Sequence, residues 1–462
     1  MYGIIGLRGE YHRLGCMKTP KFKVELRPFG EPKMVSIGHM MFGIAGTLTA
    51  NSAKLSNLSS NAGDTAFVLI SAALVLLMTP GLAFFYGGLV RHKNVLTIMM
   101  QSFISMGVVT VLWVLVGYSL AYSGDVHGII GNFNAVGLQG VGMAPTSFAP
   151  TIPALAFFLF QVMFAIITPA LITGAFADRV SFKAYLIFLV LWSLLVYIPF
   201  VHWIWGNGFL FKMGVKDFAG GIVVHLSAGM AALASVFVVG KRVIMPGQKL
   251  APHNLAYMAL GTGLLWFGWF GFNGGSALAA NGVAAVAFVN TNTAAATAMV
   301  TWLALTWWRE KKPSISGALT GAVAGLATIT PAAGYVPPLA AVIIGALASM
   351  LCYLAVQFRI RRNWDDALDV WGVHGVGGGL GTILTGVFAI AAINGTRGLL
   401  AGDAHQFGVQ VLAVAICGVY AFGVTYGLLK LVNLIVPVRV SQEVETAGLD
   451  VSLHGESAYD LG

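Results

Sequence analysis

The chain has 462 residues, of which 57% are hydrophobic and only 9% are charged, and its formal net charge is +9. So few charged side chains cannot cover a water-soluble globule of this length, and the composition therefore indicates an integral membrane protein. The basic residues are spread in small groups between apolar stretches, which argues against a nucleic-acid partner and indicates a membrane topology.

The first 53 residues divide into two predicted segments. Residues 1–33 form a polar, basic leader to which we assign no fold, and Met34 is an alternative start of translation. Residues 34–53 combine a short apolar core with small residues near 50–53, a pattern typical of a signal peptide.

Eleven apolar segments follow, each close to the length that crosses a bilayer as a helix. We expect them at 65–90, 94–122, 152–177, 181–206, 217–240, 253–278, 281–308, 314–332, 338–357, 371–392 and 406–436. The alternating ten-residue segments of an outer-membrane barrel do not occur in the sequence. The predicted fold is therefore an all-α integral membrane protein with a transmembrane domain at 65–436.

The loops between these segments differ in charge. Thirteen basic residues fall in alternate loops, from Arg91 to Arg362, whereas the other loops hold only Lys212, Lys216 and Arg397. The positive-inside rule then puts the basic loops in the cytoplasm and the N-terminus outside. The polar tail at 437–462 is expected in the cytoplasm too, where its composition favours disorder over a docking element.

Two short patterns occur once in each half of the chain. FYGGL at 85–89 ends the first span, and FNGGS at 272–276 ends the sixth. DFAGGIVVH at 217–225 opens the fifth span, and DVWGVHG at 369–375 opens the tenth. Because five spans separate the members of each pair, the pattern predicts two inverted five-helix repeats plus a final helix, with the functional site between them.

The second pattern places His225 and His374 at equivalent positions inside spans, whereas the other eight histidines, His202 among them, are expected in loops, tails or near span ends. An ionisable side chain inside a membrane is costly and usually marks a pathway or a proton relay. A neutral imidazole bonded across a helix pair is the alternative. A metal site is disfavoured because no acidic residue or third histidine lies in mid-span, and the three isolated cysteines lack CxxC spacing. We predict no cofactor.

Aromatic side chains gather where several spans are expected to reach the outer surface. They are Phe160, Phe164, Trp203, Trp205, Trp269 and Phe272, with the hydroxyl of Ser276 beside them. Each one alone is typical of an aromatic belt, but together they could hold a small cation by cation–π attraction. Asp217 is expected to cap a helix first and to attract a cation only second.

Eight motifs, in this order, resemble those of bacterial ammonium transporters of the Amt/Mep/Rh family. The resemblance covers about residues 64–462. They are MTPGLAFFYGGLVRHKNVL, DFAGGIVVH, PHNL, GWFGFNGGSA, AFVNT, PSISGALTGAVAGLATITPAAGYV, DVWGVHGV and GLDVSLHGESAY. The long leader before residue 34 departs from the family, as does Trp371, where the family has Phe.

The resemblance implies an eleven-helix protomer in a homotrimer, a pore in each protomer, and a tail that couples protomers and contributes to a face for PII-type regulatory proteins. It assigns ammonium recruitment to Phe160, Trp205 and Ser276, with Asp217 behind them. It further assigns a phenyl gate to Phe164 and Phe272, and the paired pore histidines to His225 and His374. The expected function is ammonium uptake across the inner membrane; a membrane enzyme, an ammonium sensor and a gas channel of the Rh type are the alternatives.

Overall fold

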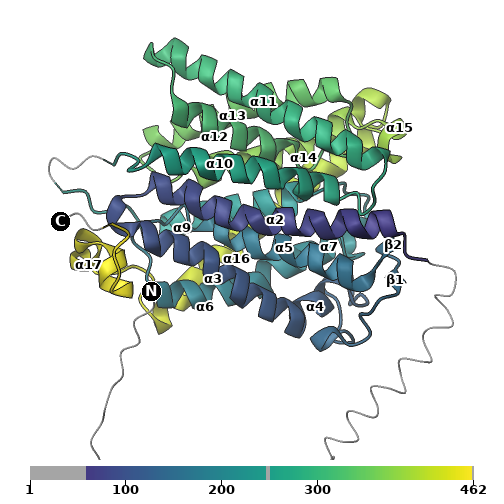
Figure 1. Cartoon of the computed structure of the whole chain (residues 1–462), viewed down its shortest axis with the longest axis horizontal. Coiled ribbons are helices and arrows are strands. Elements are labelled where there is room, and N and C mark those ends of the chain that lie inside the picture. Colours follow the sequence, from purple (N-terminus) through teal and green to yellow (C-terminus); the bar gives the residue numbers. More distant parts are fainter. Residues whose placement is uncertain (1–58, 246–249, 460–462) are drawn as a thin grey trace, which may run out of the picture. The chain divides into compact units, whose positions relative to one another are not determined.

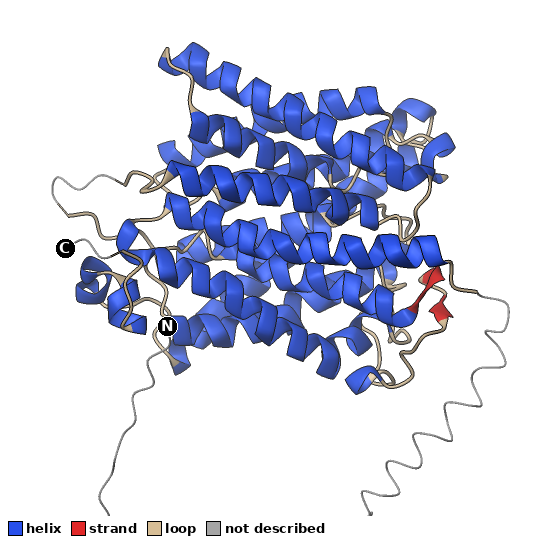
Figure 2. Cartoon of the chain, in the orientation of Figure 1, coloured by secondary structure: helices blue, strands red, loops and turns tan. Residues whose placement is uncertain are grey.

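A computed structural model of the chain describes residues 59–245 and 250–459. The predicted leader at 1–33 and signal peptide at 34–53 lie outside the described residues. The described part is mostly helical, and many of its helices run in roughly the same direction across the view (Figures 1 and 2). The helices are α2 Ala62–Leu89, α3 Val95–Leu112, α4 Tyr118–Tyr122, α5 Ala154–Ile172, α6 Phe182–Trp192, α7 Ile198–Ile204, α8 Phe209–Lys212, α9 Ser227–Val239, α10 Leu255–Trp269, α11 Gly282–Glu310, α12 Ile315–Ile329, α13 Pro338–Arg361, α14 Val376–Phe388, α15 Ala391–Asn394, α16 Ala404–Ile435 and α17 Gln442–Ala447.

Wider π-helical turns extend several of these helices. They are Trp113–Gly117, Ser193–Tyr197, Gly221–Leu226, Phe270–Gly274, Trp371–Gly375 and Asp450–His454. Three of them hold residues that the sequence singles out, namely His225, Phe272 and His374. This is typical of π-turns, which occur often at functional sites. A short antiparallel pair, β1 Pro145–Thr146 and β2 Ala149–Pro153, lies at the end of the helices opposite to α17 (Figure 1).

Nine helices among the described residues are long and apolar enough to cross a membrane. The two predicted spans outside this set are α12, which has 15 residues, and α14 with the π-turn before it. The predicted eighth span continues to residue 332, but α12 ends at Ile329 because Pro331 cannot continue a helix. The prediction of many apolar helices is confirmed. Nine of the described helices meet both the length and the apolar character of a span, and the count of eleven stays a prediction.

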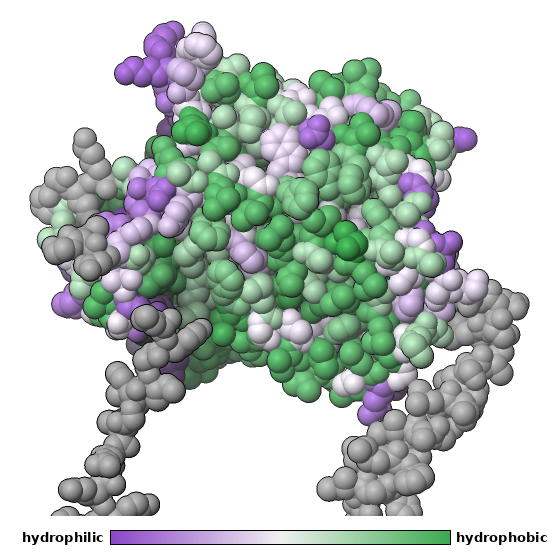
Figure 3. Space-filling model, in the orientation of Figure 1, coloured by the Kyte–Doolittle hydropathy of each residue, from purple (hydrophilic) through white to green (hydrophobic). Residues whose placement is uncertain are grey.

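The outer surface of the bundle is apolar. Hydrophobic residues dominate the face seen in Figure 3, and hydrophilic residues gather near the two ends of the helices. Large side chains such as Leu354, Val419 and Leu434 are exposed along α13 and α16. Water would disfavour so much exposed apolar surface, whereas lipid stabilises it, so the described part is a helical membrane protein.

Glycines bring α9 and the turn before α14 into backbone contact. A Cβ atom on Gly229 would collide with the backbone of Gly375, and one on Gly378 would meet the backbone of Gly221 and the Cβ of His225. Small residues allow such close approach between membrane helices. The glycines around His374 therefore serve helix packing.

The C-terminal tail packs against the helix ends, so the preference for disorder is wrong for residues 437–459. Asp450 accepts hydrogen bonds from the backbone N–H groups of Leu96 and Thr97 and thereby caps the start of α3. Glu445 is fully buried and pairs with Arg439 at 2.8 Å. Composition missed this docking because it depends on polar groups from distant parts of the chain.

Candidate functional site

Three separate spaces lie inside the bundle. At one end is a cavity of about 280 Å³ beside Trp205, which we call the Trp205 cavity. At the basic end is a cavity of about 360 Å³, the Arg242 cavity, which reaches His374. Between them lies a central passage of about 10 Å³, which is close to the smallest space that holds one water molecule.

The Trp205 cavity brings together the predicted residues at the outer end. Trp205, Ser276, Asp217 and Phe164 all line it. The indole N–H of Trp205 donates to the backbone carbonyl of Asp217 at 2.8 Å, which fixes the plane of the ring. The Ser276 hydroxyl donates to the carbonyl of Phe272 at 2.8 Å, so its oxygen keeps lone pairs for a donor in the cavity.

Phe160 lies in a second layer behind this cavity. Its ring is 1% exposed, does not line the cavity, and packs edge-on against Phe164 with ring centroids 4.9 Å apart. The structure therefore places Phe160 as a support for Phe164.

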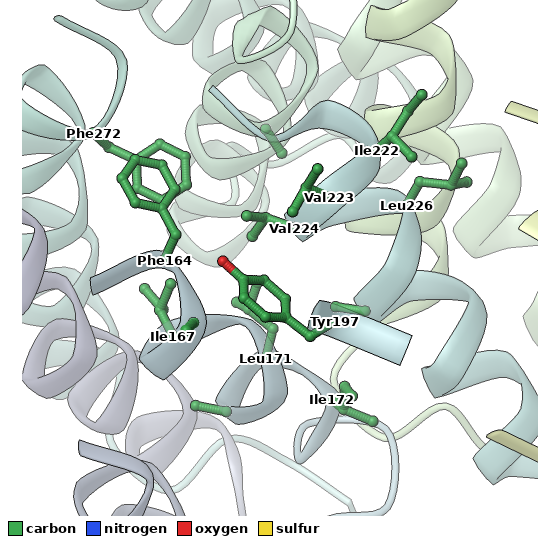
Figure 4. Close-up of a cluster of buried hydrophobic side chains, with 14 of the residues drawn as sticks. Phe164, Ile167, Leu171, Ile172, Tyr197, Ile222, Val223, Val224, Leu226 and Phe272 are labelled. Atoms are coloured by element: carbon green, nitrogen blue, oxygen red, sulfur yellow. The ribbon is translucent and has the colours of Figure 1, made fainter. Parts of the chain in front are cut away.

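Phe164 and Phe272 close the floor of the cavity. Their ring centroids are 4.3 Å apart, and both side chains are almost completely buried. Figure 4 shows the two rings one over the other, with Val224, Ile167 and Leu171 nearby. The last three side chains line the central passage, so the phenyl pair separates the passage from the Trp205 cavity.

The two intramembrane histidines face each other in the central passage. Their Nδ1 atoms are 3.2 Å apart, and the rings are nearly parallel at 21°. The π-turns Gly221–Leu226 and Trp371–Gly375 carry them, and the backbone contact of Gly229 with Gly375 sets their separation. The two residues lie 149 positions apart in the sequence and meet in space.

The Nδ1 contact requires the two rings to differ. One Nδ1 must donate and the other must accept, so a neutral pair exposes one Nε2 acceptor and one Nε2–H donor. The Nε2 of His225 has no hydrogen-bond partner among the described residues. The pair therefore offers unused hydrogen-bonding capacity in a passage lined otherwise by side chains such as Met78, Leu82, Leu265 and Val323.

Trp269 is a residue of this site that the sequence misplaced. We expected it among the outer aromatic residues, but its ring stacks on His225 with centroids 5.4 Å apart. Its indole N–H donates to the Thr330 hydroxyl at 2.9 Å. The available signal was its position three residues before Phe272 on one helix face, which points both rings into the same passage.

Asp217 caps the π-turn that carries His225. Its carboxylate accepts hydrogen bonds from the backbone N–H groups of four consecutive residues, Gly220 to Val223, at 2.6 to 3.2 Å. Such a carboxylate at a helix N-terminus satisfies donors that have no partner in the helix. The predicted cap is present: Asp217 lines the cavity, and its carboxylate oxygens accept from the backbone.

The counterpart of Asp217 in the second half of the chain is Asp366. The sequence pattern, which matched Asp217 with Asp369, is wrong on this point. Asp366 accepts from the N–H groups of Val370 and Trp371, and it precedes His374 by eight residues, as Asp217 precedes His225. Burial and then the nearby Asp369 raise the pKa of Asp366 to about 6. Asp369 instead pairs with Arg359.

Comparisons with known proteins agree over most of the chain. The model of the Ammonium Transporter Family matches residues 66–459. An ammonium transporter of Bacillus subtilis is 49% identical over 400 residues, which cover 86% of this chain and 98% of that protein. A putative ammonium transporter of Methanothermobacter thermautotrophicus is 50% identical over 407 residues, covering 87% and 99%.

Solved structures have the same fold. The crystal structure of Saccharomyces cerevisiae Mep2 superposes with a TM-score of 0.78 at 35% identity, covering 84% of this chain and 92% of that one. A structure titled Sensor Amt Protein gives the same TM-score at 30% identity, covering 85% and 98%.

Proposed function

The chain belongs to the ammonium transporter family, and from this premise we propose that it carries ammonium across the cytoplasmic membrane into the cell. The relatives are named as transporters, so the family is one of transport proteins and not of enzymes. The observation that carries the mechanism below is the histidine pair in a passage of about 10 Å³ behind two closely packed phenyl rings.

Recruitment takes place in the Trp205 cavity. The indole face of Trp205 attracts a small cation, and the Ser276 oxygen accepts a hydrogen bond from it. Phe164 supplies a second aromatic face, supported by Phe160. Asp217 contributes negative charge at the rim while its four backbone hydrogen bonds hold the turn in place.

The substrate loses a proton next to the phenyl pair, and the histidine pair on the other side of the rings takes up this proton and relays it. An intact ion in the central passage would lose its hydration to apolar walls, at a nominal cost of tens of kcal/mol in a medium of low dielectric constant. Ammonia avoids most of that cost because it is neutral. Potassium has no proton to lose, so the same passage excludes it.

Ammonia then passes His225 and His374. The free Nε2 positions can donate to its nitrogen or accept from its N–H groups, and the shared Nδ1 contact lets a proton move between the rings. The pair therefore serves as a hydrogen-bonding path for ammonia and as a proton relay. The Arg242 cavity receives the product.

For the architecture we propose eleven membrane spans. They are the nine long helices, α12, and α14 together with the π-turn before it. Two five-helix halves of opposite orientation are supported by the matching spacing of Asp217 to His225 and Asp366 to His374. The distribution of basic loops supports an N-terminus outside and a cytoplasmic tail in the inner membrane.

We further propose a homotrimer and a PII-type regulatory partner at the face where α17 docks. Both follow from the family resemblance of the tail motif GLDVSLHGESAY. The docking of Asp450 and Glu445 on the same end as the basic loops supports a tail that communicates with the helices.

The test is an ammonium-driven current. Proteoliposomes with the full chain should give a saturable current with ammonium and none with potassium. Equal currents with both ions would overturn the proposed selectivity. An ammonia flux without any current would favour a gas channel of the Rh type.

A further inference from the structure

Gln161 is a buried polar residue of α5 that takes no part in the proposed transport path. It is 8% exposed and lines the Trp205 cavity. Phe157 precedes it by four residues and Phe164 follows it by three, so the three side chains lie on one face of the helix. All three line the cavity. Gln161 is therefore the polar member of a stripe whose other members are phenylalanines.

The amide group of Gln161 makes no hydrogen bond within the described part of the chain. Its oxygen and nitrogen are nevertheless not sealed inside the protein, unlike the hydroxyl of Tyr122 in the same wall. Because the rest of the residue is buried, the accessible amide atoms face the cavity. A buried polar group without a partner disfavours the folded state, and a ligand in the cavity would supply that partner.

Most other polar groups of the cavity wall are already occupied. The carboxylate of Asp217 accepts four backbone hydrogen bonds, and the indole N–H of Trp205 donates to a carbonyl. The side-chain oxygen of Asn281 caps the start of α11. The Ser276 oxygen keeps lone pairs, as its hydroxyl donates to a backbone carbonyl. The amide oxygen of Gln161 therefore joins Ser276 as an acceptor with unused lone pairs in this wall.

We propose that Gln161 is a substrate-binding residue of the Trp205 cavity and sets its preference for ammonium over methylammonium. A cation that only donates hydrogen bonds turns the amide oxygen toward itself. Ammonium donates to Gln161 and Ser276 at once, and its other N–H groups face the ring of Trp205. Methylammonium has a methyl group in place of one N–H, so it loses one of these partners. This inference rests on the proposed function, because it adds a ligand to the cavity proposed for recruitment.

The first test compares Gln161→Leu with the wild type, because leucine has a similar size and no acceptor. Half-saturating concentrations are measured from the currents of proteoliposomes that contain the full chain, with ammonium and with methylammonium. The value for ammonium should rise about tenfold, the effect of losing one hydrogen bond to a charged group. The value for methylammonium should rise much less, because its methyl group can lie against the leucine. The preference for ammonium should therefore fall.

Two variants serve as controls. Gln161→Glu keeps an oxygen acceptor whether its carboxyl group is charged or neutral, so its half-saturating concentration for ammonium should stay at or below the wild-type value. Gln139→Leu makes the same change as Gln161→Leu at an exposed glutamine that does not line the cavity, and it should leave both values unchanged. An equal rise for both ions in Gln161→Leu would overturn the assignment. So would a rise in Gln161→Glu as large as that in Gln161→Leu.

Binding can also be measured without transport. A ligand that binds the folded state raises its melting temperature, so the purified full chain in detergent is melted with ammonium chloride and with sodium chloride. The ammonium concentration needed for a given shift should be about tenfold higher in Gln161→Leu than in the wild type. A much lower melting temperature of Gln161→Leu without ammonium would show that the amide supports the fold, and would overturn the assignment.

The two assays separate the inference from the proposed function. A wild type that ammonium stabilises but that gives no ammonium current would overturn the proposed transport, while the tenfold difference in Gln161→Leu would still support the binding site. A wild type that carries the current, together with wild-type values for Gln161→Leu in both assays, would overturn the role of Gln161 alone.

Discussion

The two aspartates that precede His225 and His374, Asp217 and Asp366, should differ in their importance for stability. Asp217 accepts four backbone hydrogen bonds, two on each carboxylate oxygen, whereas Asp366 accepts two, one on each oxygen. An Asp→Asn change keeps one oxygen and turns an amide N–H₂ toward the N–H groups on the other side. Asp217→Asn therefore loses two bonds and Asp366→Asn loses one.

The magnitudes follow from the charge on the acceptor. A hydrogen bond to a charged group contributes about 1.5 to 3 kcal/mol, so Asp217→Asn should cost about 3 to 6 kcal/mol and Asp366→Asn about half of that. The two variants are matched in chemistry and in distance from a histidine, so each serves as the control for the other.

Hydrogen exchange at about pH 8, which is above the pKa of about 6 of Asp366, is the direct assay. In Asp217→Asn, the N–H groups of residues 220–223 should exchange faster than in the wild type. This increase should be larger than the increase for residues 370–371 in Asp366→Asn. Thermal unfolding in detergent should rank the variants in the same order. An equal or larger effect of Asp366→Asn would refute the argument from counted hydrogen bonds.

Three further changes test other parts of the structure. Asp450→Ala removes the cap that the tail places on α3, so hydrogen exchange of residues 441–454 should rise by about tenfold, the effect of losing one cap. Because the pKa of Asp366 is raised to about 6, its contribution to stability should fall as pH rises from about 4 to about 6, and Asp366→Asn should flatten this part of the melting profile. Gly229→Ala should lower both melting temperature and uptake by forcing α9 away from Gly375, whereas Gly263→Ala, which has free space around it, should change neither.

The sequence predicted the features that depend on local patterns. Apolar runs identified most helices, and the motif DFAGGIVVH marked both a helix cap and an intramembrane histidine. Asp217 was recognisable because a single aspartate stands before a glycine-rich turn. These features are encoded within a few residues of one another.

The features that were missed depend on contacts between distant segments. Asp366 stands among three nearby aspartates, and only the turn conformation decides which of them caps. Trp269 faces His225 because the end of α10 meets the π-turn Gly221–Leu226 in the fold, and no local pattern sets that contact. His202 is buried by a segment that follows α4, about 80 residues earlier, with Asp125 at a separation of 77.

The most direct test of the central claim is the current through variants of the histidine pair. With ammonium and with potassium in turn, proteoliposomes containing His225→Ala or His374→Ala are compared with the wild type. We predict that His225→Ala either loses the ammonium current or passes potassium as well. The loss would follow because the path for ammonia is removed, and the potassium current because the cavity left by the imidazole admits hydrated ions. An unchanged current that still excludes potassium in both variants would contradict it.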